Sequence, residues 1–214
     1  MKIIFFIITF TYALFAQEIT LKEDGEYRLL SNVHLVNEVD YKKNGEYQAL
    51  IEVPAGTTAK WEVNHKTGNI EWEFKKGKPR NVKFLGYPGN YGFIPQSVLE
   101  KKDGGDGDPL DIIVLGPAVK RGTVQSVKIL GAIKLLDKGE QDDKIIAIPL
   151  DGPFSKVNNL GEMMRKFPGT IQIVRYWFTG YKAGKMHFMG YMKRKKAEKL
   201  VEKAHKSWKK HKHD

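Results

Sequence analysis

The sequence predicts a mainly β fold with flanking helices, of the α+β class, and two patterns lead to that prediction. Between residues 47 and 150, short segments of alternating or continuous apolar residues are separated by turns rich in Gly, Pro and Asp, as is typical of strands. After residue 157, apolar residues recur with a helical period of about 3.6. A chain of 214 residues, 41% of them hydrophobic, can bury one sizeable core, so one compact domain is expected.

Residues 1–16 predict a cleaved signal peptide. One Lys is followed by an almost unbroken apolar run and then by Ala16, the order found in secretory signals. The run is shorter than the roughly 20 apolar residues that cross a bilayer. Leu14, however, stands where a small residue is preferred for cleavage after Ala16. We expect an exported protein, periplasmic or secreted; an uncleaved anchor or an ordinary N-terminal strand is the alternative. Residues 17–44 are expected to form a short strand and a loop.

Three strands are expected next, over residues 47–53, 59–63 and 69–74, joined by turns into antiparallel hairpins. Alternation along the second strand places Lys60 and Glu62 on the same face.

A basic loop and an irregular stretch follow these strands. Residues 75–80 are mostly basic, and residues 86–95 hold too many Gly and Pro residues for regular structure to be expected. On these residues alone, Tyr87 and Tyr91 are rim aromatics of a turn.

The most informative segment is the acidic loop, residues 103–111 (DGGDGDPLD), which runs directly into an apolar strand at residues 112–115. Its glycines allow the backbone to approach a ligand closely. Its carboxylates, with no His or Cys nearby, suit a hard cation such as Mg²⁺, Mn²⁺ or Ca²⁺. An EF-hand does not fit, because Asp111 stands where Gly is needed and Pro117 where Glu belongs. Further ligands must come from elsewhere in the chain, unless the loop is only a solvated acidic turn.

A second acidic turn lies between two strands. Residues 124–136 predict one or two strands that divide near Gly131, and residues 145–150 predict another. The turn at residues 137–144 joins them into a hairpin and, taken alone, would be solvated.

Helices dominate the C-terminal part of the chain. They are expected over residues 157–167 and 171–181, with a last strand at residues 187–192. From residue 193 an apolar stripe runs along a very basic helix. We expect the stripe to pack and the basic face to be solvated; contact with a membrane or nucleic acid is the alternative.

The composition excludes several kinds of chemistry. The chain has no Cys, which excludes disulfides, a zinc–thiolate site and a thiol nucleophile. The formal charge of +11 suits an anionic partner such as a phosphate compound, nucleic acid or a membrane surface. Much of that excess lies after Lys193, so it says little about any site.

The order of these segments resembles that of the soluble family I inorganic pyrophosphatases, over about residues 47–190. The acidic loop is close to a signature of that family. The matching pieces are residues 51–55 (IEVPA), 60–62 (KWE), 87–92 (YPGNYG) and 106–111 (DGDPLD), Asp137 with Asp142 and Lys144, and Tyr181 with Lys182.

The resemblance implies a five-stranded closed barrel of OB type, with helices packed outside and the site at the barrel mouth. It also implies Mg²⁺-dependent hydrolysis of pyrophosphate to two phosphates, with several ions per site, or Mn²⁺ or another divalent ion in their place. A metal-activated water would lose its proton to Asp108, the implied catalytic residue. The other implied roles are metal binding by Asp106, Asp111, Asp137 and Asp142, substrate binding by Lys60, Arg80, Tyr91, Tyr181 and Lys182, and support of the cavity by Glu52, Glu62, Tyr87 and Lys144.

Elementary chemistry agrees with these roles. Hydrolysis of pyrophosphate needs cations that neutralise the anion and lower the pKa of an attacking water. Lys60 and Arg80 would stabilise the departing phosphate. Lys83 competes with Arg80 for this role, because the spacing before Tyr87 varies in the family.

The family also implies a homo-oligomer, and most of its members are cytoplasmic, which is the alternative to export. No nucleic acid is expected, although a barrel with Trp61, Trp72 and basic side chains could bind single strands; the acidic loops would repel their phosphates. Hydrolysis of nucleotides or polyphosphate is a third function that fits. The expected organisation is a signal peptide at residues 1–16, a barrel domain at residues 17–192, and a basic amphipathic helix and tail at residues 193–214.

Overall fold

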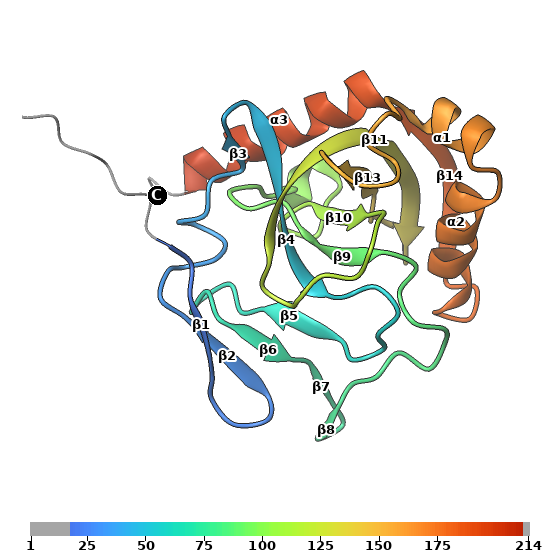
Figure 1. Cartoon of the computed structure of the whole chain (residues 1–214). Helices are drawn as coiled ribbons and strands as arrows, with labels where there is room; N and C mark the ends of the chain where they lie inside the picture. Colours follow the sequence, from blue (N-terminus) through green and yellow to red (C-terminus); the bar gives the residue numbers. More distant parts are fainter. Residues whose placement is uncertain (1–17, 212–214) are drawn as a thin grey trace, which may run out of the picture.

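A ring of five hydrogen-bonded strands forms the centre of the structure, a computed structural model that describes residues 18–211 (Figure 1). The ring runs in the order β11 (Val124–Asp137), β13 (Lys144–Pro149), β10 (Asp111–Val114), β9 (Asn90–Phe93) and β4 (Glu46–Val53), and β4 pairs with β11 to close it. Neighbouring strands are antiparallel except β10 and β13, which are parallel. The predicted mainly β fold with a five-stranded closed barrel is therefore confirmed.

Shorter strands extend the ring or form small sheets beside it. Those that extend it are β3 (Lys42–Lys43), β12 (Glu140–Gln141) and β14 (Met186–Lys193). A four-stranded sheet has the order β1 (Leu21–Glu23), β2 (Arg28–Ser31), β6 (Ile70–Trp72) and β5 (Trp61–Val63). β7 (Phe74–Lys75) and β8 (Lys78–Pro79) form a separate hairpin, and η1 (Lys101–Asp103) is a short 3-10 helix before the acidic loop.

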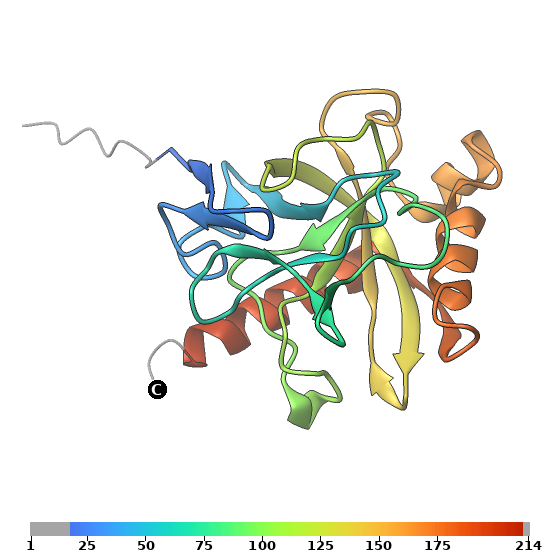
Figure 2. The ribbon, with the colours of Figure 1, turned by 90° about the horizontal axis from the view of Figure 1, so that it is seen from below.

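Within residues 18–211, three helices lie outside the barrel: α1 (Leu160–Lys166), α2 (Thr170–Gly180) and α3 (Arg194–His211) (Figures 1 and 2). α1 begins later than the pattern predicted, because the Asn159 side chain accepts a hydrogen bond from the Glu162 backbone N–H and so caps the helix there. α3 packs against β11 with the predicted apolar stripe, in which Ala197, Val201 and Ala204 are buried. No helix in the described residues is both long and apolar enough to cross a membrane.

Two sequence-based expectations about strands are wrong. β4 and β5 do not form a hairpin, because β4 pairs with β9 and β11 while β5 pairs with β6 in another sheet. The Gly- and Pro-rich residues 86–95 are not irregular throughout, since they contain β9. A Cβ atom on Gly92 would lie 1.8 Å from the Leu50 carbonyl oxygen, so this glycine is what allows β9 to approach β4.

The predicted signal peptide lies outside the described residues, and the domain boundaries after residues 16 and 192 stay predictions.

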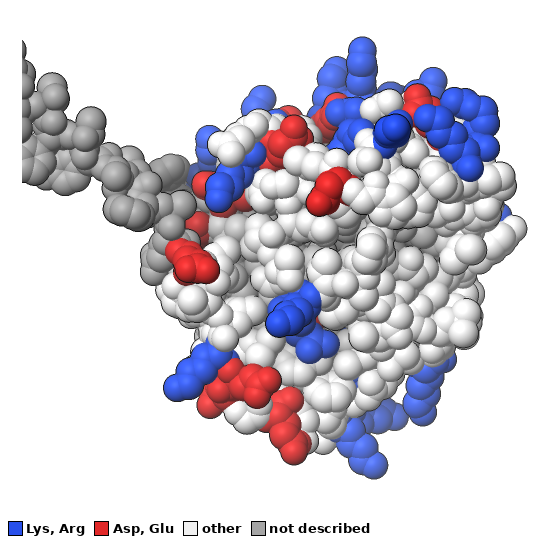
Figure 3. All heavy atoms as spheres, viewed as in Figure 1, with Lys and Arg blue, Asp and Glu red and all other residues white. Residues whose placement is uncertain are grey.

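The described surface is unevenly charged. On the face seen in Figure 1, most charged side chains lie toward the rim, with one group of Lys or Arg side chains near the centre, and the side of the molecule occupied by α2 is largely uncharged (Figure 3).

Candidate active site

A single cavity of about 370 Å³ is lined by every site residue that the sequence predicted. These residues come from strands, loops and a helix end that are far apart in the sequence. They are Glu52, Lys60, Glu62, Arg80, Tyr87, Tyr91, Asp106, Asp108, Asp111, Asp137, Asp142, Lys144, Tyr181 and Lys182. Lys83 lines a neighbouring cavity and not this one, so the geometry favours Arg80 as the cation of the site.

The acidic loop is held in place by its own backbone. Gly104 and Gly107 have positive φ angles of 88° and 94°, whereas Gly105 is needed for close approach, because a Cβ there would lie 2.3 Å from the Leu99 carbonyl oxygen. The Gln141 N–H donates to the Gly104 carbonyl oxygen at 2.9 Å. The two acidic segments that the sequence singled out are therefore hydrogen-bonded to each other.

Lysines pair with three of the predicted metal-binding aspartates. Buried Lys144 donates to both Asp111 and Asp142. Burial opposes the charge of Lys144, but these two carboxylates outweigh it and raise its pKa. Lys182 Nζ lies 2.6 Å from Asp137 Oδ2, while the buried Oδ1 atom of Asp137 has no hydrogen-bond partner in the described structure.

The side chains present fit divalent cations, although within the described residues no three acidic or His groups are already gathered around one point. Eight acidic and four Lys or Arg side chains line the cavity, so its net charge would repel a phosphate anion unless cations were added. Carboxylate oxygens are the donors that Mg²⁺ prefers. The unpartnered Asp137 oxygen is a further donor ready for a ligand.

Asp108 differs from Asp111, Asp137 and Asp142 because its ion-pair partner in the described structure is a histidine and not a lysine. His65 Nδ1 lies 3.4 Å from Asp108 Oδ1. Asp106 Oδ1 accepts the Asp108 backbone N–H at 3.0 Å, which fixes the loop between the two residues. Partial burial raises the pKa of Asp108, and the Asp106 carboxylate raises it further. Asp108 can therefore accept a proton without first breaking a lysine pair.

The cationic wall of the cavity is formed by Lys60 and Arg80. Lys60 Nζ lies 2.7 Å from Glu62 Oε1, and Arg80 Nη1 donates to Glu73 Oε1 at 2.7 Å. Burial opposes the charge of Lys60, but the Tyr87 hydroxyl and the Glu62 carboxylate outweigh it and raise its pKa. Both cations are thus charged, line the cavity and are paired with carboxylates.

Glu52 is the most deeply placed acid of the wall. Its Oε1 atom accepts the Val63 backbone N–H at 2.7 Å, and burial raises its pKa to about 8, against the opposing effect of Lys60. The Glu52 carboxyl group therefore keeps its proton to a higher pH than an exposed carboxyl group does.

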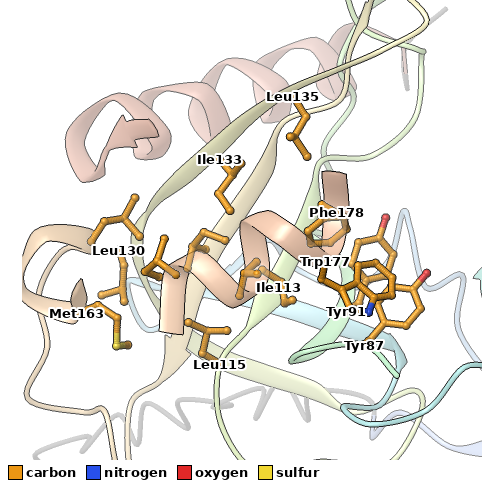
Figure 4. Packing of buried hydrophobic residues seen from close by; sticks show 14 of the residues in the cluster. Tyr87, Tyr91, Ile113, Leu115, Leu130, Ile133, Leu135, Met163, Trp177 and Phe178 are labelled. Atoms are coloured by element: carbon orange, nitrogen blue, oxygen red, sulfur yellow. The ribbon is translucent and has the colours of Figure 1, made fainter. Parts of the chain in front are cut away.

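Aromatic packing positions the tyrosine hydroxyls. The Trp177 ring contacts that of Tyr87 at 4.3 Å and stacks on that of Tyr181 at 4.7 Å. Figure 4 shows the Tyr87 and Tyr91 rings beside Trp177 and Phe178, with both hydroxyls pointing away from the apolar cluster. Tyr87 and Tyr91 are buried, so the interpretation of both as rim aromatics is wrong.

Five polar or aromatic residues of the cavity were not predicted. They are His65, Phe93, Glu140, Gln141 and Phe178. Glu140 and Gln141 belong to the acidic turn that the sequence singled out, whereas nothing local marks His65, which follows β5 by two residues. Phe178 has the apolar spacing of α2 and looks like any core residue.

The chain and its fold are similar to those of known proteins. The chain matches the family described as "Inorganic pyrophosphatase" over residues 49–209. It is 43% identical over 151 residues to an inorganic pyrophosphatase of Drosophila melanogaster, covering 64% of this chain and 45% of that protein. It is 33% identical over 214 residues to one of Candida glabrata, covering 90% of this chain and 74% of the other. Its structure is similar to the crystal structure of an N-terminally truncated vacuolar soluble pyrophosphatase of Trypanosoma cruzi in complex with PPi, with a TM-score of 0.84 and 25% identity over 100% of this chain and 99% of that one.

Proposed function

The chain belongs to the inorganic pyrophosphatase family, and we propose that it hydrolyses pyrophosphate to two phosphates in a reaction that depends on divalent cations. The observation that supports this most strongly is the convergence of all predicted site residues on one cavity. The chain spans less than half of the Drosophila relative, so the activity is proposed for this chain on its own residues. The T. cruzi relative was crystallised in complex with PPi.

The residues divide into an acidic and a basic part. Asp106, Asp111, Asp137 and Asp142 would hold the cations. Mg²⁺ bound there would neutralise the substrate and lower the pKa of an attacking water. Occupation of this part would displace Lys144 and Lys182 from the aspartates they now contact.

Asp108 would accept the proton of the attacking water, because it lies in the acidic loop without a lysine partner in the described ion pairs. His65 would hold the Asp108 carboxylate in position. The phosphate oxygens would be bound by Lys60, Arg80, Tyr91, Tyr181 and Lys182. Glu52, Glu62, Tyr87 and Lys144 would keep these groups oriented. Binding of single-stranded nucleic acid is disfavoured by the excess of carboxylates in the cavity.

The test measures phosphate release from pyrophosphate by protein lacking residues 1–16, with Mg²⁺, with Mn²⁺ and with a chelator. We expect release only with a divalent cation. Asp108→Asn should lower kcat by about 10²-fold or more with an unchanged circular dichroism spectrum, because the proton acceptor is lost. Asp111→Ala should instead recover partly at high Mg²⁺. Wild-type turnover by Asp108→Asn would exclude Asp108 as the proton acceptor.

Location and assembly belong to the same proposal. We infer export from the pattern of residues 1–16. N-terminal sequencing of the protein recovered outside the cytoplasm tests this inference. Recovery only in the cytoplasm, with residue 1 intact, would contradict export.

Self-association is supported by the exposed apolar side chains of Leu85, Ile173 and Tyr176.

A further inference from the structure

A second cavity, of about 1030 Å³, lies beside the catalytic cavity and shares part of its lining. The two cavities share Arg80, Asp137, Tyr181 and Lys182. Three of these residues, Arg80, Tyr181 and Lys182, are assigned above to the phosphate oxygens of the substrate. A ligand bound by these residues could therefore extend from one cavity into the other.

The second cavity has the opposite charge to the first. Eight of its lining side chains are Lys or Arg, and Asp137 is its one acidic lining residue. Arg80 is paired with Glu73 and Lys182 with Asp137. The remaining six lysines form no ion pair in the described structure. They are Lys75, Lys76, Lys78, Lys83, Lys138 and Lys185. We call these six the lysine groove.

Three two-residue turns from separate parts of the chain meet at this groove. They are Lys76-Gly77 between β7 and β8, Lys138-Gly139 between β11 and β12, and Ala183-Gly184 between Lys182 and Lys185. All six central residues have positive φ angles.

Two of the groove lysines occupy unfavourable backbone positions. Lys76 has a φ of 53° and Lys138 a φ of 54°, a region in which Asn, Asp or Gly is the usual residue of such a turn. Residues held in disfavoured backbone conformations are concentrated at functional sites. Both lysines line the same cavity, which gives a common reason for their presence there.

A chain of phosphates fits this groove better than a nucleic acid does. Unpaired lysines bind phosphate oxygens without regard to what the phosphates join. Single-stranded nucleic acid is bound largely by stacking on aromatic rings. The one aromatic ring that lines the groove, Tyr181, is already stacked on Trp177 with an interplanar angle of 15°.

We propose that the lysine groove binds the extending phosphates of a linear inorganic polyphosphate whose terminal phosphoryl groups lie in the catalytic cavity. This inference rests on the proposed function, because the same groups would cleave the chain. With tripolyphosphate, the oxygen of a water molecule bonds to the terminal phosphorus. The bond from that phosphorus to the bridging oxygen breaks, and its electron pair stays on the pyrophosphate that leaves. One proton of the water passes to Asp108 and the other remains on the released phosphate.

The test compares kcat/KM for tripolyphosphate and for pyrophosphate, with Mg²⁺ at constant ionic strength. The groove variant carries Lys76→Asn, Lys138→Asn and Lys185→Gln. Asn is favoured at the first two positions, so a loss of activity cannot come from strain introduced into the turns. We expect the ratio of kcat/KM for tripolyphosphate to that for pyrophosphate to fall about tenfold, since only the longer chain reaches the groove.

A matched control removes the same charge from α3. The exposed residues Lys195, Lys199 and Lys206 are changed to Gln, and the ratio should stay within about twofold of the wild-type ratio. An equal loss for both substrates in the groove variant would overturn the proposal, because the lysines would then attract any anion.

Wild-type protein that cleaves pyrophosphate but not tripolyphosphate would overturn the groove proposal and leave the proposed function standing. If neither compound is cleaved, the proposed function itself fails. Inhibition of pyrophosphate cleavage by a single-stranded oligonucleotide in the wild type and not in the groove variant, with tripolyphosphate uncleaved, would assign the groove to nucleic acid instead.

Discussion

Lys144 is buried between two aspartates of the proposed metal-binding set, and its removal should make the fold depend on Mg²⁺. Lys144→Met leaves Asp111 and Asp142 close together without a compensating charge. In the metal-free protein we expect the free energy of unfolding to fall by about 3 kcal/mol. Mg²⁺ should restore more stability to this variant than to the wild type, because it binds the folded site. Urea denaturation with Mg²⁺ and with a chelator measures both effects.

The exposed Lys134 on β11 supplies the control, since Lys134→Met removes one charge from the same barrel without touching the site. Its stability should change by less than about 0.5 kcal/mol. Equal stability of Lys144→Met and the wild type in chelator would contradict the pairing.

Glu52 should make the metal-free protein less stable as pH rises. Burial raises its pKa from an ordinary 4.5 to about 8. Between these values the unfolded chain has lost the proton while the fold still holds it, so the stability present at low pH is lost as pH increases. Relative to Glu52→Gln, the wild-type free energy of unfolding should fall by up to about 1.4 kcal/mol per pH unit. Urea denaturation in chelator from pH 4.5 to 8 measures the two stability profiles. Parallel profiles for the wild type and Glu52→Gln would exclude a raised pKa of Glu52.

At the level of single residues, local motifs identified the candidate catalytic and metal-binding side chains but not the residues that pair with them. Asp106, Asp108 and Asp111 lie within one short segment, so the sequence reveals them together. The contact of His65 with Asp108 joins a residue that follows β5 to one in the acidic loop, and only the folded chain brings them together. The same is true of Lys182, which is 45 residues from Asp137.

Among the elements, α3 is held against the barrel by its apolar stripe and not by its charged side chains. Trp208 is buried and donates its Nε1–H to Asn37 Oδ1 at 2.8 Å, and its ring stacks on His205. Trp208→Ala should therefore lower the free energy of unfolding by about 3 kcal/mol. Lys206→Ala, on the exposed face of the same helix, should change it by less than about 0.5 kcal/mol. Urea denaturation of both variants checks this, and similar values for the two would mean that the stripe contributes little.

The sequence predicted elements well where a period or a cap marks them, as for β10, β11, β14 and α2. It failed where pairing with a distant strand decides the conformation. β9 forms because Gly92 lets its backbone approach β4, a contact that no local propensity contains. The pairing of β4 with β11 likewise joins residues about 75 positions apart, so the barrel itself came from the family resemblance and not from periodicity.

On the scale of the whole molecule, the formal charge of +11 conceals two sites of opposite sign. The catalytic cavity has an excess of carboxylates, and the lysine groove beside it has an excess of unpaired cations. Divalent cations would be drawn to the first and phosphate chains to the second. The average composition could not reveal this separation, because it arises from turns that are distant in the sequence.

Self-association should use the side of the molecule formed by α2. Ile173 and Tyr176 are 61% and 62% exposed on that helix, on a side with few charges in Figure 3. Copies that each carry a large positive charge repel one another least across such a surface. We expect light scattering to give the wild type a mass that is a multiple of the chain mass, and Ile173→Glu with Tyr176→Glu to give single chains. The matched control Lys195→Glu with Lys199→Glu, on α3, should remain associated. A wild-type protein that is monomeric at all concentrations would exclude this surface as an interface between copies.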